Sequence, residues 1–546
     1  MANNKVMKRY ILAFFCLAFA SAVAASEIRS PDGKVTLSFD LENDSGRPVY
    51  DLRFGETQIV EKAGLGMETN VGDWTKGLKF LAERKSSHDV TWKPVYGERS
   101  SIRDHYNQLE VSLQTPNPEH EMVLQFRCYD EGLAMRYRIL SKSVKEQVQI
   151  KRERTEFSFL ADHQLWTTQK AQGGYSRKNL SQLRGAQERP LVMQVNDELY
   201  AAVTEAAMVD YARTLLGKSD RPHTIHTALT GQVTLETPFS SPWRVVMFGK
   251  SPGALIENNH IILSLNEPCA IDDTSWIRPG KVIREISLTT EGAKYLIDFA
   301  ERRKIEFIEF DAGWYGHEYD NKSDATTVTV DPKRSPGPLD LQGVIDYAKT
   351  KNIGVILYVN DRALKKQIDE ILPLFQEWGV AGVKYGFVDV GSQAATQCLH
   401  ENIRKAAKYK LMVDVHDNYR PTGFSRTYPN LMTTEGIRGD EEKQSPSSTL
   451  ITVFTRMIAG AGDNTICYFD PRVSQYSSRA NQLAKAVCIY SPWQFIYWYD
   501  RPALPGQTSG ARVITDEPEL VFFDHLPTVW DETRVLAGEI GEFAII

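Results

Sequence analysis

Apolar and polar residues alternate along much of the first half of the chain. Every second position is apolar in residues 34–40. The same period of two runs through residues 122–140, on both sides of an Asp-Glu-Gly sequence that is typical of a hairpin turn. Helical periodicity is scarce in this part of the chain. The pattern predicts an N-terminal antiparallel β-sandwich over residues 26–266.

From about Trp276 the pattern changes to short apolar runs that alternate with amphipathic segments. Helices are expected at residues 289–303, 341–350, 362–378, 396–408, 448–459 and 480–489, and strands at residues 305–310, 353–359, 380–388, 411–413 and 495–499. Repeated strand–helix order indicates a parallel sheet. Fully apolar strands in about eight such units favour a (β/α)₈ TIM barrel, which we assign to residues 267–510.

The two ends of the chain have patterns of their own. Residues 1–25 combine a basic start, a short apolar run and small residues before Ala25, the pattern of a secretory signal. We therefore expect cleavage near Ala25 and a periplasmic or secreted protein. Strand signals return at residues 520–523, and the chain ends on an apolar run. We expect residues 511–546 to be the start of a C-terminal β-domain that is truncated here.

Composition narrows the possible partners. The 546 residues suggest two to four domains, and the formal net charge is −6. This small negative charge argues against nucleic acid or an anionic membrane as a partner. Outside residues 1–25 the sequence has no run long and apolar enough to predict a membrane span.

Carboxylates follow several of the predicted barrel strands. Asp311, Asp361 and Asp417 come directly after strands, and Glu435 and Glu441 follow the apolar run at 430–432. Barrel enzymes display catalytic groups at the C-terminal ends of their strands. Hydrolysis of a glycosidic bond needs one carboxyl as acid and another as base or nucleophile. Three of these residues also have a structural alternative to a catalytic role. Glu441 could lie in a solvated charged loop, and Asp361 or Asp417 could cap a helix N-terminus or stabilise a turn.

Two further chemistries follow from the same region. Asp417, Glu435 and Glu441 form an oxygen-rich set, which suits Ca²⁺ better than Zn²⁺, although their spacing matches no EF-hand loop. Asp311 could bind sugar hydroxyls and Trp314 could stack on a sugar ring; the alternative for Asp311 is a structural turn.

Several motifs resemble glycoside hydrolase family 97, a family of exported bacterial α-glucosidases and α-galactosidases. They are WIRPGK (276–281), DAGW (311–314), GVKYGF (382–387), RPTG (420–423), SRTYPN (425–430) and EGIRGDE (435–441). The resemblance covers the chain after residue 25. It implies an N-terminal β-sandwich, a central barrel and a C-terminal β-domain.

The resemblance also implies residue roles. Glu441 matches the general acid, Glu435 a calcium ligand, and Asp417 a base that is also a calcium ligand in inverting members. Asp361 matches a second base position. Asp417, Glu435 and Glu441 would bind Ca²⁺. Substrate contacts are expected from Asp311, Trp314, Asn360, Lys384, His416, Arg438 and Glu205.

The chain departs from the family pattern at several of these positions. Retaining members place an Asp nucleophile where this chain has Gly386, so we expect inversion, with water entering the space that Gly386 leaves open. Asp417 and Asp361 are shorter than the Glu residues of inverting members. Gln172 stands where the N-terminal domain usually supplies a Glu to calcium.

Together these observations predict an exo-acting, inverting α-glycosidase that releases terminal glucose or galactose from an oligosaccharide or other α-glycoside. Glu441 would protonate the leaving oxygen, while Asp417 and Asp361 activate water. One rival is a sugar-binding protein that has lost catalysis. Another is a retaining α-glycosidase with a different nucleophile, such as Asp389.

Overall fold

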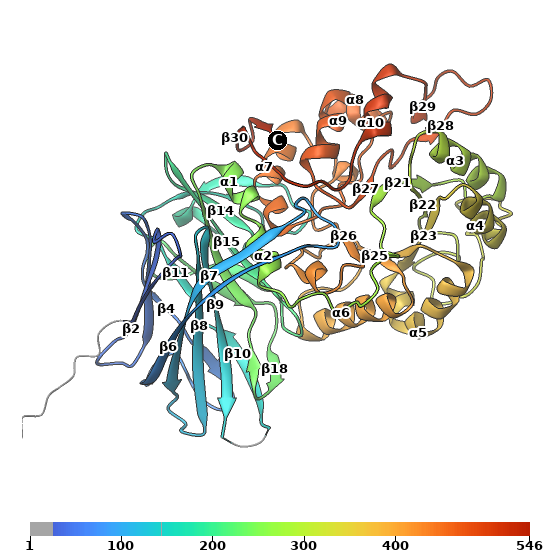
Figure 1. Ribbon diagram of the computed structural model, residues 1–546. Helices are drawn as coiled ribbons and strands as arrows, with labels where there is room; N and C mark the ends of the chain where they lie inside the picture. The colour runs from blue at the N-terminus through green and yellow to red at the C-terminus, as the bar shows by residue number, and fades with distance from the viewer. Residues whose placement is uncertain (1–25, 143–144) are drawn as a thin grey trace, which may run out of the picture.

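The computed structural model describes residues 26–142 and 145–546, so the predicted signal at 1–25 lies outside the described residues. The N-terminal region is a broad antiparallel sheet against which three smaller sheets pack (Figure 1). The broad sheet has the order β13 (Ser176–Asn179), β12 (Gln164–Thr167), β14 (Leu191–Asn196), β15 (Leu199–Ala206), β20 (Trp243–Gly249), β9 (Gly132–Ser141), β8 (His120–Tyr129), β7 (Ile102–Gln114) and β6 (Lys79–Trp92), with β19 (Phe239–Ser240) paired to β9.

The smaller sheets are also antiparallel. They comprise β1 (Ser26–Arg29), β2 (Val35–Leu41), β3 (Pro48–Phe54) and β4 (Thr57–Gly64); β18 (Val233–Glu236), β10 (Gln147–Glu153) and β5 (Met67–Thr69); and β11 (Glu156–Ser158), β17 (Thr224–Leu229) and β16 (Thr214–Lys218). Alternation explains the packing, because Val35, Leu37 and Phe39 of β2 are buried while the residues between them are not. The predicted N-terminal antiparallel β-domain is confirmed.

The second region is a barrel of parallel strands. Its hydrogen-bonded order is β26 (Leu431–Thr434), β25 (Met412–Val415), β24 (Gly382–Gly386), β23 (Gly354–Asn360), β22 (Phe307–Phe310), β21 (Gly280–Glu285) and β27 (Trp493–Phe495). An extended segment, residues 463–466, lies between the two end strands: Asp463 N donates to Thr434 O at 3.0 Å and Trp498 N to Ile466 O at 2.9 Å. The predicted barrel is confirmed, with this irregular segment near its closure.

Helices cover the outside of the barrel strands (Figure 1). They are α3 (Thr290–Arg302), α4 (Leu341–Thr350), α5 (Asp361–Trp378), α6 (Gln393–Lys408), α7 (Pro446–Val453), α8 (Pro471–Tyr476) and α9 (Arg479–Cys488). Local sequence fixes their ends: Asn360 caps α5 by accepting from Arg362 N, and Gly379 ends it with φ 82°. Among the described residues, no helix is long and apolar enough to cross a membrane.

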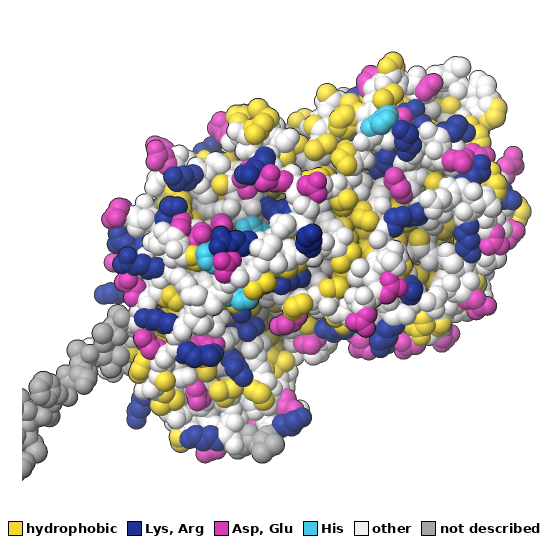
Figure 2. Space-filling view, viewed as in Figure 1, with side chains coloured by type: hydrophobic (Ala, Val, Ile, Leu, Met, Phe, Trp, Pro, Cys, Tyr) yellow, Lys and Arg dark blue, Asp and Glu magenta, His cyan; other side chains and the backbone are white. Residues whose placement is uncertain are grey.

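Several connections join the two regions. Helices α1 (Pro252–Glu257) and α2 (His260–Ser264) link them along the chain. The long β6–β7 hairpin reaches from the broad sheet to the barrel beside β26 (Figure 1), where Tyr96 OH donates to the carbonyls of Pro429 and Leu431 at 2.7 Å each. Positive and negative side chains are interspersed on the face shown in Figure 2, in keeping with the small net charge.

The last part of the chain differs from expectation. The strand predicted at residues 520–523 is helical, in η5 (Pro518–Leu520) and α10 (Val521–His525), because Leu520 and Phe523 pack into the barrel core as one apolar face. The remaining strands here are short: β28 (Arg501–Pro502), β29 (Val513–Ile514), β30 (Ala537–Glu539) and β31 (Phe543–Ile545). The other short helices are η1 (Leu180–Gln182), η2 (Phe424–Arg426), η3 (Asp440–Glu442) and η4 (Arg456–Ala459).

Candidate active site

The candidate site lies where the barrel strands end. Parallel strands bring their C-terminal ends to one mouth, so acids that follow different strands meet there. The groups involved come from β22 and β24 to β26, from η3, and from residues 463 and 498–499.

Glu441 is held by two aromatic donors. It lies in η3, just beyond β26, and its Oε1 accepts hydrogen bonds from Trp498 Nε1 at 2.5 Å and Tyr499 OH at 3.0 Å. The next residue back, Asp440, fixes this turn by binding Lys485 and by accepting from Cys467 N. Glu441 is therefore positioned through one oxygen, which leaves the other oxygen available for chemistry.

Asp417 and Glu435 are linked directly. Asp417 N donates to Glu435 Oε2 at 2.5 Å, and Asp417 Oδ2 accepts from Phe387 N at the end of β24. Burial raises the pKa of Glu435 to about 8, and the carboxylates of Glu441 and Asp417 contribute in the same direction. Burial likewise raises the pKa of Asp417. The carboxylates of Glu441 and Asp417 are therefore close enough to act on the buried Glu435.

These three carboxyls are the calcium ligands that the sequence predicts, but among the described residues the group whose ligand atoms all lie within 4.8 Å of one another is a different one, Asp414, His416 and Asp463. Glu441, Asp417 and Glu435 each commit one oxygen to N–H or O–H donors, and the second oxygen of each takes part in no hydrogen bond among the described residues. An all-oxygen donor set of this kind suits Ca²⁺. Gln172, the residue at the N-terminal calcium position of the family, lies near this region through Arg420. Arg420 donates to the carbonyl of Ala171, which precedes Gln172, and to the carbonyl of Gly436, which follows Glu435.

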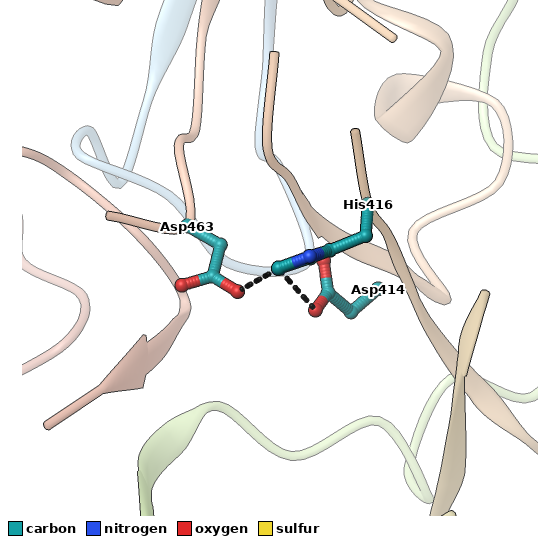
Figure 3. Close-up of side chains that lie close together, drawn as sticks. All are labelled: Asp414, His416 and Asp463. Atoms are coloured by element: carbon teal, nitrogen blue, oxygen red, sulfur yellow. Dashed lines mark hydrogen bonds and ion pairs between the residues drawn. The ribbon is translucent and has the colours of Figure 1, made fainter. Parts of the chain in front are cut away.

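A second group, made of Asp414, His416, Asp463 and Lys384, forms the buried floor of the mouth. His416 Nε2 lies 2.7 Å from Asp463 Oδ2 and 3.9 Å from Asp414 Oδ2, between the two acids (Figure 3). Their ligand atoms all lie within 4.8 Å of one another, so this group could hold a metal ion. Lys384 Nζ is already 3.4 Å from Asp463 Oδ2 and 3.7 Å from Asp414 Oδ2, and supplies positive charge at the same place.

Burial and neighbouring charges shift the pKa values of two groups at this floor, His416 and Glu309. Burial opposes the charge on His416, but Glu435 and Asp463 outweigh it and raise the pKa to about 10. Glu309 is fully buried, and among the described residues neither of its carboxylate oxygens has a hydrogen-bond partner. Burial raises the pKa of Glu309 far above its usual range, and the neighbouring Asp311 adds to this shift.

Asp311 completes the rim of this floor. Its Oδ2 is 2.9 Å from Arg284 Nε. Burial opposes ionisation, but Arg284 and Lys384 outweigh it and lower the pKa of Asp311. Arg284 also lies over the rings of Trp498 and Tyr499, 4.6 and 5.6 Å from their centroids. It therefore supports the two aromatic donors that hold Glu441.

The space beside Gly386 is filled rather than open. A Cβ placed on Gly386 would lie 2.0 Å from Tyr358 Cε2 and 2.3 Å from its hydroxyl oxygen. Tyr358 is buried on β23, and its hydroxyl accepts from Asn360 Nδ2 at 3.3 Å. The expectation that water enters a void beside Gly386 is therefore wrong, because the phenol ring of Tyr358 occupies it.

Comparison with known families identifies both regions of the chain. The family model described as "Glycosyl-hydrolase 97 N-terminal" matches residues 28–268, and "Glycoside hydrolase 97" matches residues 276–437. The chain belongs to glycoside hydrolase family 97. The predicted glycoside hydrolase of the α-glucosidase/α-galactosidase type is confirmed.

Similar family 97 proteins cover nearly the whole chain. It is 25% identical to a retaining alpha-galactosidase of Bacteroides thetaiotaomicron, over 99% of this chain and 88% of the relative. It is 26% identical to a probable retaining alpha-galactosidase of Streptomyces bingchenggensis, over 93% and 78%. A family 97 enzyme from Pseudoalteromonas sp. strain K8, solved with acarbose, has the same fold: TM-score 0.84, 24% identity, 95% and 86% coverage.

Some predicted contacts lie elsewhere in this family 97 fold. Trp314 is fully buried, donates to Tyr358 O at 2.8 Å and packs against Phe375 and Trp378, so it cannot stack on a ligand. Glu205 is equally buried, with both carboxylate oxygens bound to arginines, and cannot contact substrate. Both predictions are wrong because these residues complete packing behind the mouth.

The other predicted residues stand as follows. Asp361 is half-buried and pairs with Lys365 Nζ at 2.6 Å, and Lys365 also pairs with the exposed Asp389. No contact in the described part of the chain joins Asp361 to Asp417 or Glu441, so its role as a base stays a prediction. Asn360 caps α5, and Arg438 lies on the loop of Glu441, bonded to Glu442 O at 2.8 Å.

Sequence reasoning missed several groups of the mouth. They are Arg284, Glu309, Tyr358, Asp414, Asp463, Trp498 and Tyr499. A signal existed for two of them, since Glu309 and Asp414 alternate with Asp311 and His416 along their strands and must share the inward face. Asp463 had none, because the segment around it lacks the pattern of a strand.

A buried network connects the N-terminal domain to the loop that carries Glu435. Arg244 binds Glu153 and Glu205, and Glu205 also binds Arg189. Arg189 O accepts from Arg420 Nη1 at 2.9 Å, and Arg420 Nε donates to Gly436 O at 3.0 Å. Gly436 has φ 49° and directly follows Glu435. The N-terminal domain thus helps to fix the backbone of the loop that carries Glu435.

Proposed function

We propose that this family 97 chain is an exo-acting α-glycosidase that releases terminal α-linked galactose or glucose from oligosaccharides, with inversion of configuration. The names of the curated relatives favour galactose, while a solved relative was crystallised with acarbose. In the floor, His416 keeps 10% of its side chain exposed and can reach a hydroxyl of the terminal sugar, while the fully buried Lys384 and Asp463 hold it from behind.

In this proposal Glu441 is the general acid. It protonates the glycosidic oxygen while Asp417 takes a proton from the attacking water. An inverting pair needs room for that water, with carboxyls roughly 6.5–9.5 Å apart. Asp361 is a second candidate for activating water. If Ca²⁺ is bound by Asp417, Glu435 and Glu441, it would offset their mutual repulsion and help to orient them.

The observation that carries inversion is Gly386 at the end of β24. A retaining enzyme needs a carboxylate that can attack the sugar, and Gly386 offers none. Because the ring of Tyr358 fills the space beside Gly386, the attacking water has to approach Asp417 from another side. The relatives named as retaining favour the opposite mechanism. For that alternative Asp389 is a weak nucleophile candidate, because its side chain is 71% exposed and paired with Lys365.

We also propose that the protein is exported and acts in the periplasm or outside the cell, on the pattern of residues 1–25. The test of function is a hydrolysis screen on aryl α-galactosides and α-glucosides, with and without a calcium chelator. We expect turnover of at least one of them and its loss on chelation. Sugar binding without any turnover would support the rival, a sugar-binding protein without catalysis.

A further inference from the structure

Two large aromatic side chains are exposed together at the rim of the mouth. Phe387 follows β24 directly and is 54% exposed; Tyr319, in the loop after β22, is 53% exposed. Their rings lie 5.5 Å apart at 67°, an edge-to-face contact. A single exposed aromatic residue needs no explanation, but two in contact beside a catalytic group form an apolar surface for a ligand.

The backbone of Phe387 is unusual for such a residue. Its φ is 54°, in the left-handed region that a bulky side chain rarely adopts and that Gly or Asn would occupy more easily. This conformation lets its N–H donate to Asp417, the proposed base. A glycine would offer the same N–H, so the presence of a Phe points to a use for the ring itself.

Tyr319 is fixed in its place. Its N–H donates to His317 Nδ1 at 3.2 Å, and the His317 ring lies 5.8 Å from its own. The adjacent Glu318 binds Arg334 at 2.5 Å, and its carbonyl accepts from Arg362 Nε at 3.0 Å. The loop therefore holds an exposed ring at a defined position, which reduces the ordering cost of binding.

We propose that Phe387 and Tyr319 form the binding surface for the leaving group, and that the leaving group is a sugar ring. The floor would bind the sugar to be released, and the bond to be cleaved would lie between the floor and this aromatic surface. The apolar C–H face of a pyranose packs on aromatic rings, while its hydroxyls can reach the polar groups beside Phe387, namely Asp389 and Lys365. This inference rests on the proposed glycosidase function.

The test compares two substrates of the same terminal sugar. One is an α-linked disaccharide, and the other is the glycosyl fluoride, whose leaving group cannot stack. We expect Phe387→Ala and Tyr319→Ala to lower the ratio of kcat/KM for the disaccharide to kcat/KM for the fluoride by about tenfold, mainly through KM. Phe387→Tyr and Tyr319→Phe keep a ring and should restore the ratio.

A matched control lies at the other end of the barrel. Phe522 in α10 is 41% exposed, and α10 is bound by Lys281 near the start of β21, far from the mouth. Phe522→Ala should leave the ratio at its wild-type value. An equal loss on both substrates in Phe387→Ala and Tyr319→Ala, or no loss in either, would overturn this inference. If the wild type cleaves neither substrate, it is the proposed function that fails.

Discussion

Two clusters of buried charge in this molecule are built in opposite ways. In the N-terminal domain two arginines meet two glutamates: Arg244 binds Glu153 with two nitrogens at 2.6 and 2.7 Å and Glu205 at 2.6 Å, while Arg189 binds the other oxygen of Glu205. At the barrel mouth, by contrast, carboxyls outnumber the cations beside them, and Glu309 has no hydrogen-bond partner among the described residues.

The difference separates structural from functional charge. A buried ion pair with every oxygen satisfied mainly fixes one arrangement of the chain. Buried carboxyls such as Glu435, whose pKa is raised by burial and by neighbouring carboxylates, are held in an unfavourable state, which proteins maintain where chemistry or a ligand requires it. We therefore expect changes in the first cluster to alter stability, and changes at the mouth to alter activity.

The largest effect should come from Glu441→Gln. It removes the proton donor but keeps the size and hydrogen-bonding oxygen of the side chain. We expect kcat on an α-glycoside with a poor leaving group to fall about 10³-fold or more, with little change in thermal stability. Steady-state kinetics and a melting curve measure both quantities.

Glu442→Gln is the matched control, because Glu442 is the exposed neighbour in the same turn. It should retain wild-type kcat. Equal losses in the two variants would show that the charge of the loop matters rather than proton donation by Glu441.

The converse change is Glu205→Gln in the N-terminal cluster, in which Arg189 and Arg244 meet Glu153 and Glu205. It leaves Arg189 and Arg244 short of a buried counter-charge, so we expect the free energy of unfolding to fall by about 3–5 kcal/mol. Urea unfolding followed by tryptophan fluorescence measures this. Glu198→Gln, at an exposed position in the turn between β14 and β15, should change little. A stable Glu205→Gln protein with greatly reduced kcat would contradict the structural role.

The contrast also shows what the sequence could predict. The period of two and the strand–helix repeat gave the two regions of the fold, and carboxylates at strand ends led to Glu441, Asp417 and Glu435. Trp314 and Glu205 were placed wrongly, because a side chain beside a strand end can face the mouth or the packing behind it, and the local pattern is the same. The filling of the space at Gly386 depends on Tyr358, a contact between strands that no single segment reveals.

Metal removal should give an effect of intermediate size. If Ca²⁺ relieves the crowding among Asp417, Glu435 and Glu441, saturation at 100 times Kd would stabilise the folded state by about 2.7 kcal/mol. We expect a chelator to lower the melting temperature by several degrees in the wild type and by much less in Glu435→Gln. Identical chelator effects in both proteins would contradict this set of ligands.

The smallest effect concerns Asp500, a buried acid that is held by backbone N–H groups alone. Its Oδ2 accepts from Tyr468 N at 2.7 Å and Phe469 N at 3.1 Å, yet burial raises its pKa to about 7. The folded state therefore binds this proton more tightly than the unfolded state, and stability from this group falls as pH rises from about 4 to about 7.

Asp500→Asn removes this dependence. From pH 5 to pH 8 the wild type should lose about 2.6 kcal/mol relative to the variant. Chemical unfolding at the two pH values measures the difference, with the exposed Asp516→Asn as a control that should follow the wild type. Parallel behaviour of the wild type and Asp500→Asn would show that Asp500 is ionised across this range.

The most direct test of the central claim is the anomeric configuration of the first sugar released from an α-glycoside, followed by ¹H NMR before mutarotation. Glu441 as acid, with water activated by Asp417 and no attacking carboxylate at Gly386, predicts that the β-anomer appears first. Initial release of the α-anomer would contradict the account and would require a nucleophile elsewhere in the mouth.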